Sequence, residues 1–256
     1  MSLSPRQTEI LALARSMGRV MVEDLARHFD VAVQTIRRDL GDLADLGHLE
    51  RIHGGAVPRQ GMVNIAYERR RRMNAAGKAA IGAAVAAQIP ESSSVILTLG
   101  TTTEAVAQAL LHHRNLTVIT NNMNVANILA ANPGCEIMVA GGALRRSDGG
   151  LVGALTADFF AQFKADIAVL SASALDGDGD LLDYDLAEVR VSQAIIAQAR
   201  ATFVVADHMK LSRSAPARIA SLSAVARLFT DAPLPLPLAQ RCADWGCEVV
   251  IAPPGP

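Results

Sequence analysis

The sequence is poor in cysteine and aromatic residues, and it contains no long hydrophobic run. Its three cysteines, Cys135, Cys242 and Cys247, are odd in number and are spaced like neither a disulfide framework nor a zinc site, so we expect buried free thiols. No apolar run approaches the roughly 20 residues that span a bilayer, and the N-terminus lacks a signal-peptide pattern. We therefore expect a cytoplasmic protein without a membrane partner, and nothing in the sequence predicts a metal ion or a cofactor.

The chain does contain ample apolar material for a core, and its charge is unevenly distributed. Half of its 256 residues are hydrophobic, which is enough for one large domain or for a small and a medium one. The first 78 residues carry 13 basic and 9 acidic side chains, a net charge of +4, whereas the remainder carries 11 basic and 16 acidic ones, a net charge of −5. A basic N-terminal region on an acidic body suggests contact with a phosphate backbone.

The N-terminal region shows the signals of three short helices. Ser4 and Gln7 have the spacing of a capping box, and apolar residues then recur at helical spacing until Gly18. A second helix is predicted over VEDLARHFD, residues 22–30. A third begins in VAVQTIRRDL, residues 31–40, and ends near a glycine at position 47.

The third predicted helix has one apolar and one polar face. At about 100° per residue, Ile36, Leu40 and Leu43 form its buried stripe. A short helix, a turn and a helix of this kind predict a helix-turn-helix, whose second helix enters the major groove. A three-helix structural domain with a solvated face is the alternative. The outward side chains that we expect to contact DNA are Gln34, Thr35, Arg37 and Arg38.

The next segment, HLERIHGGAV, predicts a small two-stranded wing. Leu49 and Ile52 stand among polar residues, and a glycine pair supplies the turn. Arg51 and His53 would then touch the DNA backbone or the minor groove. Together with the three helices, this segment predicts a winged helix-turn-helix domain.

From residue 94 onward, short apolar runs rich in β-formers alternate with helical patterns. Strands are predicted over residues 94–100, 116–120, 135–142, 166–173, 201–207, 225–231 and 248–252, and helices over residues 101–113, 123–132, 157–163 and 185–200. This alternation predicts an α/β fold with a mostly parallel sheet that helices cover on both faces. In such open sheets, ligands bind beyond the carboxyl ends of the strands.

Residues suited to bind an anion follow several of these strands. A glycine and three threonines lead straight into a helix, whose free N–H groups and hydroxyls can cradle a phosphate. No Gly-Lys-Ser/Thr sequence follows, so a nucleoside triphosphate loop is not indicated. Ordinary turn and capping roles are the alternative for any one of these residues. The predicted effector-binding residues are Gly100, Thr101, Thr102, Thr103, Asn121, Gly141, Gly142, Glu188, Asp207 and Lys210.

The acidic stretch DGDGDLLDYDLAE, residues 176–188, has part of the pattern of a calcium-binding loop. Leu181 stands where that loop requires glycine, and Ala187 stands where it requires an acid. We therefore expect a turn here and no calcium site.

The segment VQTIRRDLGDLADLGHLERIHGGAV resembles the signature of the DeoR family of bacterial transcriptional regulators. The resemblance continues to about Asp231, through GTTTEAVAQALLHHRNLTVITNNMNVAN, AGGALRRSDGGLVG and EVRVSQAII. It implies a winged helix-turn-helix domain over residues 1–57, a linker over 58–78, and an effector domain over 79–256. The fold of the effector domain would be like that of ribose-5-phosphate isomerases and CoA transferases. The chain departs from the family pattern at Ala32, Thr98, Ser171 and Ala174, where the family commonly has serine, aspartate, glycine and glycine.

The resemblance and the predicted anion site together imply a repressor whose affinity for double-stranded operator DNA falls when a small phosphorylated polyol or sugar binds. Glycerol 3-phosphate is the leading candidate for this effector. A homo-oligomer, dimer or tetramer, is expected because one small helix-turn-helix reads only a few base pairs. Two alternatives remain open: a sugar-phosphate isomerase or deaminase, and a DNA-binding regulator with a vestigial pocket.

Overall fold

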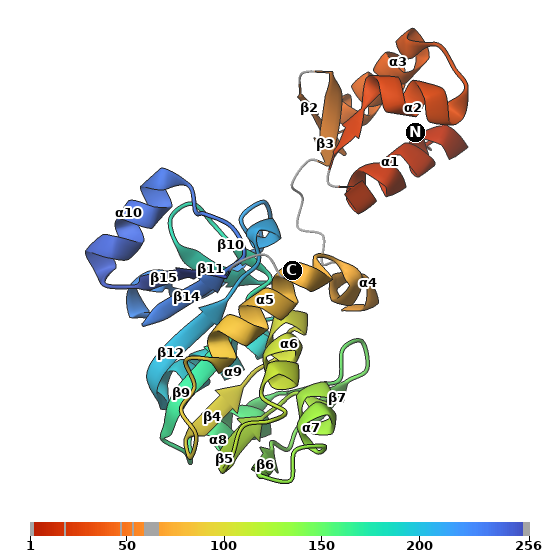
Figure 1. Ribbon diagram of the computed structural model, residues 1–256. Coiled ribbons are helices and arrows are strands. Elements are labelled where there is room, and N and C mark those ends of the chain that lie inside the picture. The colour runs from red at the N-terminus through yellow and green to blue at the C-terminus, as the bar shows by residue number, and fades with distance from the viewer. Residues whose placement is uncertain (1–2, 18, 47, 53, 59–66, 253–256) are drawn as a thin grey trace. The chain divides into compact units, whose positions relative to one another are not determined.

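In the computed structural model, the chain forms two compact units, Met1–Val63 and Asn64–Pro256 (Figure 1). The structure describes residues 3–17, 19–46, 48–52, 54–58 and 67–252. Among these residues, no helix is both long enough and apolar enough to cross a membrane.

The first unit consists of three helices and a small sheet. Its elements are α1 (Pro5–Met17), β1 (Val20–Met21), α2 (Val22–Phe29), α3 (Val33–Asp45), β2 (Leu49–Ile52) and β3 (Gly55–Pro58). The strands pair in the order β1-β3-β2, so the predicted two-stranded wing gains a third strand. Strand β1 was not predicted, because two residues are too few to show an alternating pattern.

Local chemistry fixes the ends of these helices. At the start of α1, the Ser4 hydroxyl accepts the Gln7 N–H at 3.1 Å, and the Gln7 side chain accepts the Ser4 N–H at 3.0 Å, which confirms the predicted capping box. Helix α2 ends at Asp30, whose left-handed backbone makes the turn into α3. Ile36, Leu40 and Leu43 are buried as predicted, in a core that all three helices share.

The second unit is built around a parallel sheet of seven strands, in the order β15-β14-β12-β9-β4-β5-β6. Its strands are β4 (Ser94–Leu97), β5 (Leu116–Thr120), β6 (Cys135–Val139), β9 (Ala165–Leu170), β12 (Ala199–Val205), β14 (Arg227–Thr230) and β15 (Glu248–Ile251). Every neighbouring pair in this sheet is parallel. Each strand that the sequence predicted is present, and the fold belongs to the predicted α/β class.

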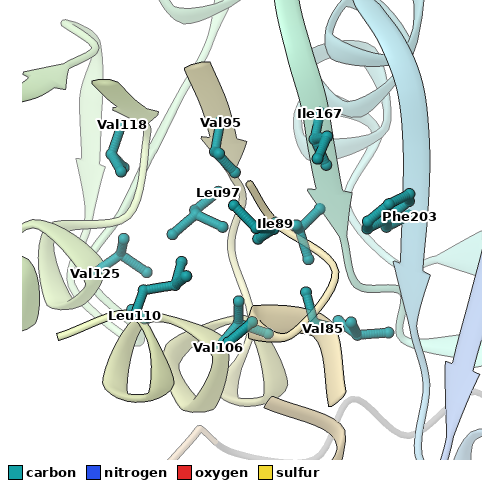
Figure 2. Close-up of a cluster of buried hydrophobic side chains, with 14 of the residues drawn as sticks. Val85, Ile89, Val95, Leu97, Val106, Leu110, Val118, Val125, Ile167 and Phe203 are labelled. Atoms are coloured by element: carbon teal, nitrogen blue, oxygen red, sulfur yellow. The ribbon is translucent and has the colours of Figure 1, made fainter. Parts of the chain in front are cut away.

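Helices cover both faces of this sheet. One face carries α5 (Ala75–Ala86), α6 (Thr101–Ala109) and α7 (Met123–Leu129), and the other carries α8 (Ala154–Phe160) and α9 (Leu186–Ala197). Strand β4 shows the alternation: Val95 and Leu97 pack toward the first set of helices, whereas Ile96 packs toward the second. Figure 2 shows the first cluster, with Val85 of α5 and Val106 of α6 facing the strands. Helix α8 begins three residues earlier than predicted, directly after Gly153.

Smaller elements complete the unit, and the sequence patterns missed most of them. They are α4 (Tyr67–Arg72), the hairpin of β7 (Ala143–Arg145) and β8 (Gly150–Val152), the sheet of β10 (Ala174–Leu175), β11 (Asp180–Asp183) and β13 (Ala217–Ser221), and α10 (Leu236–Trp245). The acidic stretch forms the turn between β10 and β11, in which the Asp176 carboxylate accepts the N–H groups of Asp178 and Asp180. This is the turn chemistry that the sequence predicted.

The strand order places the direction change of the chain between β4 and β9. From β4 the chain runs outward through β5 and β6, and it then returns to the other side of β4 for β9, β12, β14 and β15. In open α/β sheets, ligands bind at such a switch point, beyond the carboxyl ends of the strands. The loops after β4 and β9 are therefore the first place to look for a site.

Candidate functional site

The outward face of α3 carries the side chains that the sequence assigned to DNA. Gln34, Arg37 and Arg38 are exposed, and Thr35 is half-buried beside them. Arg37 lies near the Gln34 side-chain oxygen, at 3.5 Å, and among the described residues Arg38 has no ion-pair partner. The face is therefore polar and cationic, and its side chains can reach base edges and phosphates.

Helix α3 is anchored to α1 by a partly buried ion pair. The Arg6 guanidinium donates to the carboxylate of Asp39 at 2.6 Å, and Asp39 is buried. This contact holds the polar face in a fixed orientation. At its N-terminus the helix is capped by Ala32, which makes no side-chain hydrogen bond, so the donors of the first turn lack the hydroxyl acceptor that a serine would supply.

The wing contributes one described candidate. Arg51 lies on β2, and its side chain is exposed. The second predicted wing residue, His53, lies outside the described residues. The turn that follows it begins at Gly54, whose φ of +75° requires a residue tolerant of the left-handed region.

A pocket lies at the switch point of the large sheet, within the second unit. We call it the inner pocket; its walls come from the loops after β4 and β9, from α4 and α9, and from the segment after β12. Its lining residues are Arg70, Leu99, Gly100, Thr101, Asp148, Ser171, Ala172, Ser173, Asp183, Glu188 and Lys210.

One end of the inner pocket is cationic. Lys210 is buried and lines the pocket, and among the described residues its ammonium group has no hydrogen-bond or ion-pair partner. Burial, with a smaller contribution from the nearby Arg213, lowers the pKa of Lys210 to about 7, against the opposing charge of Asp207. Burial likewise lowers the pKa of Lys78 and that of Arg213. An anion bound here would relieve the repulsion among these cations.

The start of α6 forms the adjoining wall. The first backbone hydrogen bond of the helix runs from the Glu104 N–H to the Gly100 carbonyl at 3.0 Å, so the N–H groups of Thr101 to Thr103 have no partner among the described residues. Gly100 has a φ of +135°, and a Cβ atom there would lie 2.8 Å from the Cβ of Ser171. Only glycine lets the two loops approach this closely.

Another part of the lining is acidic, and Arg145 holds its carboxylates together. This guanidinium donates to Asp148 at 2.9 and 2.7 Å, to Asp185 at 2.8 Å and to Glu188 at 2.6 Å. Burial raises the pKa of Glu188 to about 7, and the negative charge of Asp183 adds to this shift, while Arg145 opposes it. Near neutral pH, Glu188 can therefore both accept and donate hydrogen bonds.

The inner pocket adjoins a second pocket, which we call the outer pocket. The two share Arg70, Asp148, Ser173, Asp183 and Glu188. The outer pocket adds Tyr67, Arg145, Ser147, Tyr184, Asp185 and Leu186. A bound molecule could thus extend from the cationic end past the carboxylates.

The structure brings some of the predicted effector residues together and leaves others apart. Four of them line the inner pocket: Gly100, Thr101, Glu188 and Lys210. Asp207 does not line it, and its carboxylate instead caps the turn that carries Lys210 by accepting the Met209 N–H at 3.1 Å. The remaining predicted residues, Thr102, Thr103, Asn121, Gly141 and Gly142, do not line it.

Strand order explains this separation. Asn121 follows β5, and the two glycines follow β6, which are one and two strands beyond β4, away from β9. The Asn121 amide instead donates to the Leu151 carbonyl at 2.9 Å. Thr102 and Thr103 point into the protein from the buried side of α6, although their backbone N–H groups stay at its start.

Sequence reasoning missed Arg70, Asp148, Ser173 and the organising role of Arg145. Arg70 belongs to a run of four arginines, residues 69–72, and only the fold distinguishes the one that lines the pocket. Asp148 belongs to the hairpin connection between β7 and β8, which has no periodic pattern. Such positions give no local signal, because tertiary packing alone brings them to the site.

The departures from the family pattern have different structural roles. Thr98 is buried, and its hydroxyl donates to the Val169 carbonyl at 3.1 Å, so it ties β4 to β9. Ser171 lines the inner pocket. Ala174 is buried at the start of β10.

Comparison with known proteins agrees with this two-part organisation. A model of the DeoR-like helix-turn-helix domain matches residues 6–60, and a model of the DeoR C-terminal sensor domain matches residues 73–232. Among solved structures, D-ribose-5-phosphate isomerase in complex with phospho-erythronic acid has a TM-score of 0.39, with 17% identity over 52% of this chain and 53% of that chain.

Curated relatives match nearly the whole chain. The glycerol-3-phosphate regulon repressor of Escherichia coli is 43% identical over 98% of this chain and 100% of its own length. The HTH-type transcriptional repressor CsqR of the same organism is 41% identical over 97% of this chain and 95% of its own. The glycerol-3-phosphate regulon repressor of Haemophilus influenzae is 44% identical over 90% of each chain. Both parts of this chain therefore have counterparts in one family, and the chain belongs to the DeoR family of helix-turn-helix transcriptional regulators.

Proposed function

We propose that this protein is an operator-binding repressor that a small phosphorylated polyol or sugar releases from DNA. Glycerol 3-phosphate is the first candidate for the effector. Two of the named relatives are repressors of a glycerol-3-phosphate regulon, and the chemistry of the inner pocket fits this class of ligand. A repressor of this kind would act in the cytoplasm, where the DNA lies.

The observation that carries the proposal is the division of charge within the pocket. Lys210 and the start of α6, with its unpaired N–H groups, line the same pocket as the carboxylates Glu188 and Asp183. A phosphate needs N–H donors and a cation, whereas hydroxyl groups are bound well by carboxylates. A molecule with a phosphate at one end and hydroxyls at the other satisfies both.

On the DNA side, the proposal assigns Gln34, Thr35, Arg37 and Arg38 to the major groove. Their exposure on α3 and the ion pair that anchors α3 support this assignment. Arg51 and His53 remain the candidates for contacts from the wing. Arginine can grip guanine bidentately, and glutamine can pair with adenine.

We further propose that the protein acts as a homo-oligomer, a dimer or a tetramer. A single helix-turn-helix reads few base pairs, and two-fold pairing places two of them on half-sites about one helical turn apart, or a multiple of it. Sedimentation at micromolar concentration tests this. Full operator affinity from a chain that sediments only as a monomer would rule it out.

The rival expectation of an isomerase or deaminase is not retained. Relatives that match over nearly the full length of the chain are named repressors, and the chain carries the helix-turn-helix that a sugar-phosphate enzyme does not use. The chain is therefore a regulator and not an enzyme. A vestigial pocket remains the alternative that experiment must address.

The proposal is tested by a thermal-shift panel of polyol and sugar phosphates on the full chain, with the unphosphorylated compounds as controls. We expect glycerol 3-phosphate to raise the melting temperature and glycerol to leave it unchanged, because the cationic end needs the phosphate. Stabilisation by none of the phosphate esters would show that the pocket is vestigial.

A further inference from the structure

Arg70 is a cation of the inner pocket whose contact with its partner is long. It lies on α4 and lines both the inner and the outer pocket. Its terminal nitrogen lies 3.5 Å from the Asp148 carboxylate. Its Nε atom is buried and has no hydrogen-bond partner among the described residues. A guanidinium in this state has donors to offer to an incoming anion.

Asp148, in contrast, keeps its close hydrogen bonds if Arg70 moves away from it. Both of its oxygens already accept close hydrogen bonds from Arg145, at 2.9 and 2.7 Å, and one of them also accepts the Gly150 N–H at 3.2 Å. A phosphate dianion offers Arg70 more charge and a bidentate geometry. Exchange of the long Asp148 contact for a phosphate is therefore favourable.

Helix α4 is also attached to neighbouring helices at both of its ends. The Tyr67 hydroxyl at its start donates to Glu104 of α6 at 2.8 Å. At its end, the buried ammonium of Lys78 donates to the carbonyls of Arg70 and Met73. In the chain, α4 is the first described element after β3 of the DNA-binding unit, with eight residues between them.

We propose that Arg70 releases Asp148 and binds the effector's phosphate, so that occupancy of the pocket sets the position of α4, the helix that follows the DNA-binding unit. This inference rests on the proposed function, because it names a residue that binds the same effector and the helix that responds to its binding. On this proposal α4 has two arrangements, and the effector favours one of them. An effector can change operator affinity only through such a preference for one of two states.

Calorimetry on the full chain tests the ligand role. The variants are Arg70→Gln and Arg70→Lys, with Arg72→Gln as the matched control, because Arg72 is an exposed arginine of the same helix outside both pockets. The probes are glycerol 3-phosphate and inorganic phosphate. Loss of a charged bidentate contact predicts roughly 10- to 100-fold weaker binding of either probe to Arg70→Gln. Arg70→Lys retains part of the affinity, and Arg72→Gln binds as wild type does.

Hydrogen exchange of the α4 backbone tests whether α4 responds to effector binding. Glycerol 3-phosphate should slow exchange over residues 67–73 in wild type and in Arg72→Gln, and it should have no such effect in Arg70→Gln at saturating ligand. Equal affinity of wild type and Arg70→Gln overturns the inference while leaving the proposed function intact. An α4 exchange rate that the ligand does not change also overturns the inference and leaves the proposed function intact. If the wild-type protein binds neither probe, both the inference and the proposed function are wrong.

Discussion

The chain presents cations in two contrasting settings. Arg37 and Arg38 are exposed on α3, where water solvates their charge at no cost. Lys210 is buried at the switch point, and its desolvation lowers its pKa to about 7. Exposed cations attract a polyanion through counterion release and are sensitive to salt. A buried cation is held at a cost that a bound anion or the loss of its proton removes, and it is therefore sensitive to pH. On the proposed function, the same charge would serve two forms of phosphate recognition.

The largest expected effect comes from Lys210→Met, which removes the buried cation. We expect effector affinity to fall by about 3 kcal/mol, or more than 100-fold, because the phosphate loses its desolvated partner. Stability without the effector should not fall, since replacing a buried charge by an apolar side chain of similar size is often neutral or stabilising. Calorimetry and urea unfolding measure the two effects, with Lys164→Met, an exposed lysine, as the control. If Lys210→Met binds the effector as tightly as wild type does, the phosphate does not bind at Lys210.

The exposed cation predicts a second effect of a different kind. Arg38→Ala should weaken operator binding by about 1–3 kcal/mol if Arg38 reads a base, or flatten the salt dependence by about one ion if it touches phosphate. It should leave effector affinity untouched. Gel shifts at several salt concentrations distinguish these cases. Binding that is unchanged at every salt concentration removes Arg38 from the interface.

The pKa of Lys210 predicts a third, smaller effect. Its value in the folded protein, about 7, lies below its ordinary value of 10.5. Between these values the unfolded chain binds more protons, so this group makes the folded state more stable as pH rises from 7 toward 10.5. Effector binding has the opposite trend, because the phosphate needs the charged amine.

Above pH 7 a phosphate monoester stays dianionic, since its second pKa is about 6, so the protein dominates the change. We expect effector affinity to weaken from pH 7 to pH 9, by at most about tenfold per pH unit for one proton. Deprotonation of Glu188, whose pKa is also about 7, acts in the same direction. Calorimetry across this range measures the slope, which should become shallower in Lys210→Arg. A flat profile in wild type would contradict a buried, titrating lysine at the phosphate.

The smallest expected effect concerns the cap of the recognition helix. Ala32 has the extended backbone of an N-cap, with φ −61° and ψ 143°, but it has no acceptor. Ala32→Ser should stabilise the first unit by about 0.5–1 kcal/mol, and Ala32→Gly should fall short of that gain by only about a few tenths of a kcal/mol. Thermal unfolding of the variants measures this. No gain with serine would show that the first turn of α3 is already satisfied.

Sequence patterns predicted the first unit well because helical spacing separates its buried side chains from its exposed ones. The spacing of Ile36, Leu40 and Leu43 determines which face of α3 is buried, and hence which side chains point outward. The strands of the second unit were equally predictable from their apolar runs. In both cases the signal is local and periodic.

The pocket was only partly predictable, because its position depends on the order of the strands. Gly100 and Lys210 were expected at a shared sheet edge, and they line one pocket. Asn121 was expected at the same edge, but it follows β5, on the far side of β4 from β9. No pattern in a single sequence reveals that order. Arg70 and Asp148 come from segments without any periodic signal, and only packing brings them to the site.

The most direct test is an operator titration with and without glycerol 3-phosphate, on wild type and on Lys210→Met, at one fixed salt concentration. Selection from a random pool of duplexes supplies the operator. We expect the effector to weaken operator binding by wild type about 5- to 150-fold, the usual range of coupling between two sites. Lys210→Met should bind the operator as wild type does and should not respond. Equal operator affinity of wild type with and without saturating glycerol 3-phosphate would show that this molecule is not the inducer.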